Sequence, residues 1–93
     1  MMNNTTGRAD AVGQRTLDIL REVTGEREVL ADPDIPLYTS GLLDSLGTVT
    51  LMVAFEEAFG LTISPAEFDK ETWATPRAVV ADIERRLSEA HPA

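Results

Sequence analysis

Hydrophobic residues recur at spacings of three and four in three segments of the chain, which is the periodicity of an amphipathic helix. The first segment starts after Asp10, a residue type that caps helices, and ends at Gly25, a common helix stop. Residues 1–9 lack the pattern and are expected to form a disordered N-terminal tail, which leaves residues 10–90 as the folded domain. The apolar face of this first predicted helix comprises Val12, Thr16, Ile19, Leu20 and Val23.

The second predicted helix runs from about Ser45 to Phe59, ends at Gly60 and is apolar on two faces. Its first face suits a hydrophobic core and comprises Leu51, Met52, Phe55 and Phe59. Its second face begins beside Ser45 and comprises Leu46, Val49 and Val53. Because Glu56 and Glu57 border this second face, we interpret it as a surface for partner proteins. The alternative is that the helix is central and that both faces are buried.

Residues 25–44 show no clear period and contain turn signals at Pro33 and Pro36. A segment of about 20 residues without regular structure is uncommon in a compact domain and is often functional. Its apolar side chains are expected to pack onto the helices, so that the segment is an ordered loop rather than a linker. These side chains are Val29, Leu30, Ile35, Leu37, Leu42 and Leu43.

The remainder of the chain predicts a short helix and a third long one. Ser64 to Glu67 has the pattern of a capping box with proline at the first helical position, and this short helix should end around Trp73. Thr75 and Pro76 would open the last helix in the same way, and its buried face comprises Val79, Val80, Ile83 and Leu87. No segment alternates at period two for long enough to be a strand. The predicted fold class is therefore all-α, a bundle of three longer helices plus one short helix, with a long ordered loop after the first.

Length and charge narrow the classes of function. The 93 residues suit one domain, and 16 acidic against 8 basic residues give a net charge of −8. Nucleic acids and anionic membranes are bound through basic patches, so both are excluded as expected partners. No apolar run approaches the roughly 20 residues that cross a bilayer, and the polar start has no signal-peptide pattern. A cytoplasmic protein is expected.

The chain lacks the side chains of an enzyme or a metal site. It has no cysteine, and its one histidine, His91, is the third residue from the end, where a frayed terminus is expected. A serine nucleophile needs a base beside it, and neither His91 nor the neighbouring acids satisfy this requirement. Asp32 and Asp34 do not belong to a calcium-binding loop, and no glycine-rich phosphate loop is present. Glu56 with Glu57, and Glu67 with Asp69 and Glu71, could imitate a catalytic pair of carboxylates, but we interpret them as solvated helix faces.

Ser45 is the candidate for chemistry because of its place at a predicted helix start. The unpaired N–H groups and the dipole of a first helical turn would favour a phosphate ester on its hydroxyl. The plainer alternative is that Asp44 or Ser45 only caps the helix, which contributes on the order of 1 kcal/mol. Local sequence alone favours the plain cap.

The motif GLLDSL at residues 41–46, followed by an apolar helix with acidic flanks, resembles the acyl carrier protein superfamily. A narrower resemblance, to the D-alanyl carrier proteins, rests on DI at 34–35, GTV at 47–49, EFD at 67–69, Trp73 and TP at 75–76. Two positions depart from that group. Leu46 replaces an aromatic residue that is often found after the serine, and Thr50 stands where glutamate is common.

The resemblance implies that Ser45 carries 4'-phosphopantetheine, transferred from coenzyme A by a phosphopantetheinyl transferase. It further implies that an adenylating amino-acid ligase loads the thiol of this arm and that an acyltransferase or synthase receives the thioester. Asp44 would be recognised by the transferase. The other residues expected to contact partners are Leu46, Val49, Val53, Glu56 and Glu57. A chain that must meet successive partners is expected to be a monomer.

The sequence leaves three functions open. Arginine supplies seven of the eight basic residues, with Lys70 the exception, which hints at a GC-rich genome. Together with Leu46 and Thr50, this bias favours a stand-alone aminoacyl carrier in natural-product biosynthesis, such as polyketide macrolactam assembly. The alternative within the same class is a D-alanyl carrier for D-alanylation of teichoic acid. The alternative of another class is an unmodified helical interaction module in which Ser45 has no more than a capping role.

Overall fold

The computed structural model describes the backbone of residues 4–90 and the side chains of residues 11–66 and 68–90. Every regular element in that part is helical, which confirms the predicted all-α class. The long helices are α1 (Asn4–Thr24), α3 (Ser45–Phe59) and α4 (Pro76–Ala90). The short elements are α2 (Glu28–Ala31) and two 3₁₀ helices, η1 (Pro65–Glu67) and η2 (Lys70–Trp73).

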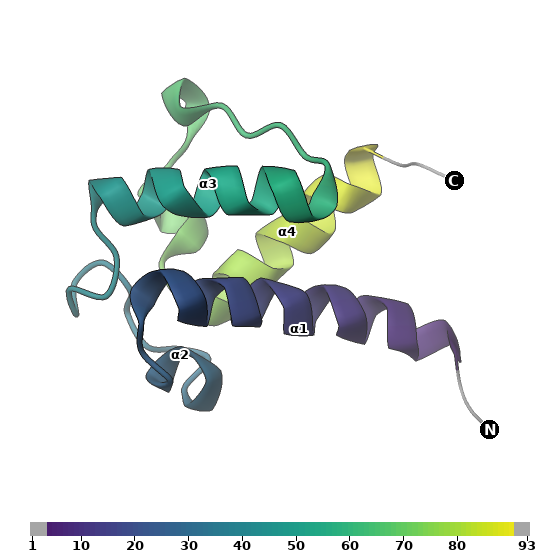
Figure 1. Cartoon of the computed structure of the whole chain (residues 1–93), viewed down its shortest axis with the longest axis horizontal. Helices are drawn as coiled ribbons and strands as arrows, with labels where there is room; N and C mark the ends of the chain where they lie inside the picture. The colour runs from purple at the N-terminus through teal and green to yellow at the C-terminus, as the bar shows by residue number, and fades with distance from the viewer. Residues whose placement is uncertain (1–3, 91–93) are drawn as a thin grey trace.

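The helix α1 lies at the centre of the packing and contacts α3, α4 and α2 (Figure 1). In Figure 1, α1 and α3 run side by side in opposite directions, and α4 crosses at an angle to both. The loop between α1 and α3, which contains α2, gathers at one end of the bundle together with the first turn of α3. Ser45 therefore lies at the end opposite to the start of α1 and the end of α4.

The helix α1 begins at Asn4, several residues before the expected start after Asp10. Residues 4–9 are thus helical rather than part of a tail, whereas residues 1–3 of the expected tail lie outside the described residues. Each residue added to an existing helix gains a backbone hydrogen bond without needing an apolar face, so periodicity could not predict this extension. Further along α1, the predicted face does pack inward, with Thr16, Ile19 and Leu20 buried.

The loop between α1 and α3 is ordered, as predicted, because its apolar side chains enter the core. Val29, Leu37 and Leu43 are buried, and Ile35 and Leu42 pack partly against them. Leu30 differs from the expectation, since 43% of it is exposed. It belongs to α2, a single turn that the sequence did not predict and that directs Val29 inward and Leu30 outward.

Backbone hydrogen bonds attach this loop to the second half of the chain. The amide of Leu37 donates to the carbonyl oxygen of Ala74 at 2.8 Å, and the amide of Arg77 donates to that of Pro33 at 2.9 Å. The guanidinium of Arg77 also forms a two-bond ion pair with the Asp34 carboxylate, at 2.9 and 3.0 Å. The loop that leads to Ser45 is therefore held by the start of α4.

The single short helix expected between Ser64 and Trp73 is instead the pair η1 and η2, and Ser64 makes no side-chain capping hydrogen bond. Phe68 adopts an extended backbone between the two turns. Its ring lies 4.5 Å from the buried Trp73 ring, centroid to centroid, so core packing accompanies the break in the helix. The last helix does open at Thr75, whose hydroxyl oxygen accepts from the amide of Ala78 at 3.1 Å. His91 and Pro92, expected to end it, lie outside the described residues.

Candidate functional site

Asp44 caps α3, and Ser45 is the first residue of the helix. The Oδ1 atom of Asp44 accepts from the amide of Gly47 at 2.8 Å, and the Asp44 carbonyl oxygen accepts from the amide of Thr48 at 2.9 Å. Helix capping at this point is thus performed by Asp44. The hydroxyl of Ser45 is not needed for the cap.

Ser45 is exposed, and no hydrogen bond within the described part of the chain engages its hydroxyl. In the same set of residues, the amides of Ser45 and Leu46 meet no backbone or side-chain acceptor. Unpaired amides at the start of a 15-residue helix attract anions, and the helix dipole adds to the effect. The junction therefore offers a reachable oxygen beside a local environment that suits a phosphate ester.

The second apolar face of α3 is exposed over its whole length. Leu46 is 75%, Val49 47% and Val53 49% exposed, whereas the core face of the same helix is buried at Leu51 and Phe55. The alternative in which both faces are buried is therefore wrong. Three large apolar side chains are left in solvent on one side of a helix that begins at Ser45, and we call this surface the exposed stripe.

Glu56 and Glu57 were both expected to contact partners, but they have different surroundings in the structure. The Oε2 atom of Glu56 accepts from the amide of Ile63 at 3.0 Å, which ties the end of α3 to the segment that follows it. Glu57 is exposed and lies eleven residues after Leu46, three helical turns on, so it continues the exposed stripe. The two acids could not be separated beforehand because the approach of Ile63 depends on the tertiary fold.

Two contacts at this junction were missed by sequence reasoning. The hydroxyl of Tyr38 lies 2.7 Å from the Oγ1 atom of Thr48, and that oxygen in turn donates to the carbonyl oxygen of Asp44 at 2.8 Å. A Cβ atom at Gly47 would lie 3.2 Å from Leu43 Cδ2 and 3.3 Å from Asp44 Oδ1, so glycine leaves room for the cap. Aromatic residues in loops are common, and the sequence carries no signal that Tyr38 would reach α3.

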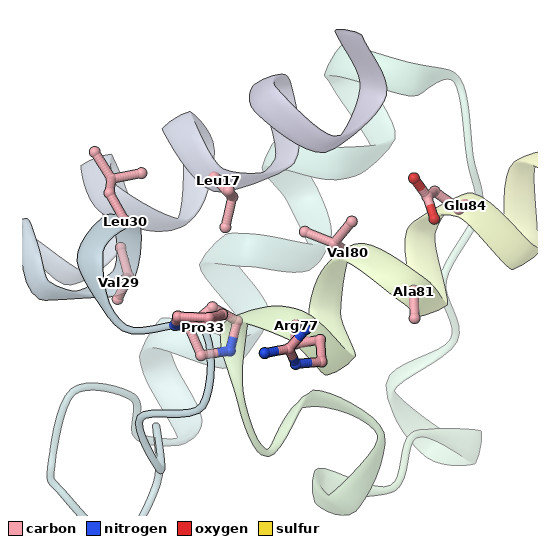
Figure 2. A pocket seen from close by; sticks show the side chains of 9 residues that line it. Leu17, Val29, Leu30, Pro33, Arg77, Val80, Ala81 and Glu84 are labelled. Atoms are coloured by element: carbon pink, nitrogen blue, oxygen red, sulfur yellow. The ribbon is translucent and has the colours of Figure 1, made fainter. Parts of the chain in front are cut away.

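A separate hollow of about 310 Å³ lies where α1, the loop and the start of α4 meet (Figure 2). Figure 2 shows Leu17 from α1 and Val80 from α4 on facing walls, with Leu30 and Pro33 from the loop segment beside them. Ser45 is not among its lining residues, so the hollow does not belong to the attachment junction.

Among the side chains that the structure describes, no group of three or more His, Cys, Asp or Glu residues could hold a metal ion. None of the helices within residues 4–90 is long and apolar enough to cross a membrane.

Comparison with known proteins places the chain in a family. Residues 14–83 match the family described as "Phosphopantetheine attachment site". The chain is 49% identical over 67 residues to the D-alanyl carrier protein of Bacillus velezensis. The aligned residues make up 72% of this chain and 86% of the relative. The chain is 40% identical over 73 residues to the D-alanyl carrier protein of Enterococcus faecalis, covering 78% and 94% respectively. The chain therefore belongs to the phosphopantetheine-attachment family of carrier domains, which hold 4'-phosphopantetheine covalently.

Proposed function

We propose that Ser45 is the residue that carries the 4'-phosphopantetheine arm. The observation that supports this proposal best is an exposed hydroxyl on the first residue of α3 that makes no hydrogen bond with the residues the structure describes. Asp44 already caps the helix through Gly47, so a modification at Ser45 would leave the cap in place. The residues matched by the family, 14–83, include this junction.

The proposed cargo is D-alanine, held as a thioester and passed from an adenylating ligase to an acyltransferase of the D-alanylation of teichoic acid. The similar proteins of Bacillus velezensis and Enterococcus faecalis are both D-alanyl carrier proteins, and each is covered over most of its length. This similarity supports the D-alanyl alternative better than the natural-product function that Leu46, Thr50 and the arginine bias favoured. Those features are compositional or single-residue departures, and they weigh less than identity spread along the domain.

The proposed partner surface is the exposed stripe together with Asp44 at its start and Glu57 at its end. Apolar side chains that the fold leaves in solvent can be covered by a transferase, ligase or acyltransferase in turn. The net charge of −8 favours partners with basic rims and steers their approach. Because exposed ion pairs contribute only about 0–1 kcal/mol each, such complexes would be of micromolar affinity and release quickly.

Intact-mass measurement after coexpression with a phosphopantetheinyl transferase tests the attachment site. The wild-type chain should gain the mass of one phosphopantetheine group, and Ser45→Ala should gain none. Ser88→Ala, at an exposed serine on α4, is the matched control and should be modified like the wild type. A wild-type chain that stays unmodified, or a Ser45→Ala variant that is modified, contradicts the proposal and favours the unmodified interaction module.

Loading of the modified chain tests the cargo. The chain is offered to a D-alanine-adenylating ligase and, separately, to a ligase of natural-product assembly that activates a β-amino acid. We expect the kcat/KM for loading to be at least about tenfold higher with the D-alanine ligase, which corresponds to about 1.4 kcal/mol. The reverse ratio would restore the natural-product function.

A further inference from the structure

The hydrogen bonds around Thr48 have only one consistent direction. A hydroxyl has a single proton to donate, and that of Thr48 points to the carbonyl oxygen of Asp44 at 2.8 Å. A carbonyl oxygen cannot donate, so the proton of Thr48 is committed to this bond. The hydroxyl of Tyr38, 2.7 Å from the same Thr48 oxygen, is therefore the donor in the second bond. The result is a chain of two bonds from the loop, through α3, to the residue before Ser45.

These two hydrogen bonds add to the contacts that fix Asp44. The Asp44 carbonyl oxygen accepts from both the hydroxyl and the amide of Thr48, and its carboxylate accepts from the amide of Gly47. The carbonyl oxygen and the carboxylate of Asp44 are thus both held, and the peptide bond to Ser45 starts from this carbonyl group. Of these bonds, only the one to the Thr48 hydroxyl is connected to the preceding loop through Tyr38.

Tyr38 also has contacts with the segment around η2. The Nζ atom of Lys70, in η2, lies 5.4 Å from the centroid of the Tyr38 ring, and the preceding residue, Leu37, is hydrogen-bonded to Ala74. The ring is half-buried, and burial raises the pKa of the Tyr38 phenol, so the hydroxyl keeps its proton at neutral pH. A donor whose ring and neighbouring backbone both contact the η2 segment can orient its acceptor.

We propose that Tyr38 is a positioning residue for Ser45, acting through Thr48 and Asp44 to hold the serine in the orientation that accepts the arm. This inference rests on the proposed function, because it takes Ser45 as the acceptor. In that transfer the Ser45 oxygen forms a bond to the phosphorus that bears pantetheine, and its proton passes to a base of the transferase. The pyrophosphate bond of coenzyme A breaks, and the nucleotide half leaves. A misoriented nucleophile slows such a step without weakening the encounter of the two proteins.

Kinetics of arm transfer with one phosphopantetheinyl transferase provide the first measurement. Tyr38→Phe and Thr48→Val each remove one hydroxyl from the two hydrogen bonds that link Tyr38 to Asp44. We expect kcat to fall about three- to tenfold while KM for the carrier stays within about twofold. Thr48→Ser keeps the hydroxyl and should retain the wild-type kcat. Thr16→Val is the matched control, because Thr16 is a buried threonine of α1 whose hydroxyl donates to the carbonyl oxygen of Val12 at 2.7 Å. It should not change kcat.

Amide hydrogen exchange provides the second measurement and does not require that the chain be modified. In Tyr38→Phe and Thr48→Val we expect the amides of Gly47 and Thr48 to exchange about five times faster, with the amide of Phe55 in the same helix unchanged. Equal acceleration at Phe55 would mean a general loss of stability and would overturn the positioning role. Unchanged exchange at Gly47, or an unchanged kcat, would overturn it as well. A wild-type chain that accepts no arm overturns the proposed function instead, so the two failures are distinguishable.

Discussion

The indole N–H of Trp73 donates to the Oδ2 atom of Asp82 at 2.9 Å, and both side chains are buried. Two arginines of α4 are further hydrogen-bond partners of Asp82. Arg86 Nε lies 2.7 Å from the same Asp82 oxygen, and Arg85 Nη2 lies 2.6 Å from the other. Burial by itself would raise the pKa of Asp82, but the hydrogen bonds from Arg86, Trp73 and Arg85 hold that pKa below its usual value of 3.8. A buried carboxylate thus stays charged in the core at neutral pH.

Asp82 should make the fold sensitive to acid. Because its pKa is lower in the folded than in the unfolded chain, its contribution to stability is fully present above the usual value of 3.8 and is lost as the pH falls through the lower, folded value. Asp82→Asn should destabilise the protein at pH 7 by about 2 kcal/mol and reduce the loss of stability below about pH 4. Denaturant unfolding followed by the fluorescence of Trp73, the one tryptophan, measures both effects. If Asp82→Asn lost as much stability below about pH 4 as the wild type does, this role would be contradicted.

Gly47→Ala should disturb the cap of α3 without a large change in overall stability. Alanine favours a helix over glycine by about 1 kcal/mol, but its Cβ would press on Leu43 and Asp44 at 3.2 and 3.3 Å. We expect the helix preference and the steric pressure to cancel to within about 1 kcal/mol in the free energy of thermal unfolding. The hydrogen-exchange rate of the residue 47 amide and the rate of arm transfer to the carrier should both change. Gly13→Ala is the control, because its Cβ would meet Val80 at an ordinary 3.7 Å, and it should stabilise the protein by about 0.5–1 kcal/mol. Unchanged exchange at residue 47 would mean that the cap tolerates a methyl group.

Charge reversal at the two acids near the end of α3 should separate a partner contact from a structural one. Glu57→Lys should lower the kcat/KM for ligase coupling up to about fivefold at low salt, with the effect fading as salt rises. It should leave thermal stability unchanged, since Glu57 is exposed. Glu56→Lys should instead cost about 1–2 kcal/mol of stability, because the amide of Ile63 loses its acceptor. If the two variants exchanged these phenotypes, the assignment of Glu57 to the partner surface would be wrong.

The two apolar faces of α3 should respond differently to truncation. Leu46→Ala, on the exposed stripe, should change the free energy of unfolding by less than about 0.5 kcal/mol yet weaken coupling to the ligase. Leu51→Ala, on the buried face of the same helix, should cost about 2–5 kcal/mol. Urea denaturation and ligase kinetics, run on the same preparations, check both expectations. Wild-type kinetics for Leu46→Ala would remove that side chain from the partner surface.

The sequence predicted α3 to its observed bounds because both ends carry local signals. Asp44 supplies the cap, and Gly60, in the left-handed region at φ 71°, supplies the stop. Spacing within the helix also separated the face that is buried from the face that is exposed. These features depend on spacing within one helix, which a sequence states directly.

The features that sequence reasoning missed depend on contacts between distant segments. Asp82 was not recognised as a buried residue because its partner Trp73 belongs to another element. Glu56 could not be told from Glu57 without the approach of Ile63, and Tyr38 could not be linked to Thr48 without the path of the loop. The break between η1 and η2 accompanies the packing of Phe68 on Trp73 rather than following from helix propensity. In each case tertiary structure decided what local pattern left open.

The exposed stripe also bears on how concentrated solutions of the free protein behave. Three uncovered apolar side chains on one helix would let two copies associate face to face, and the surplus of acidic residues opposes this by mutual repulsion. Colloidal stability is therefore coupled to ionisation. Acidification or strong screening should promote self-association before the fold is lost, and the Leu46→Ala substitution should delay the onset of turbidity.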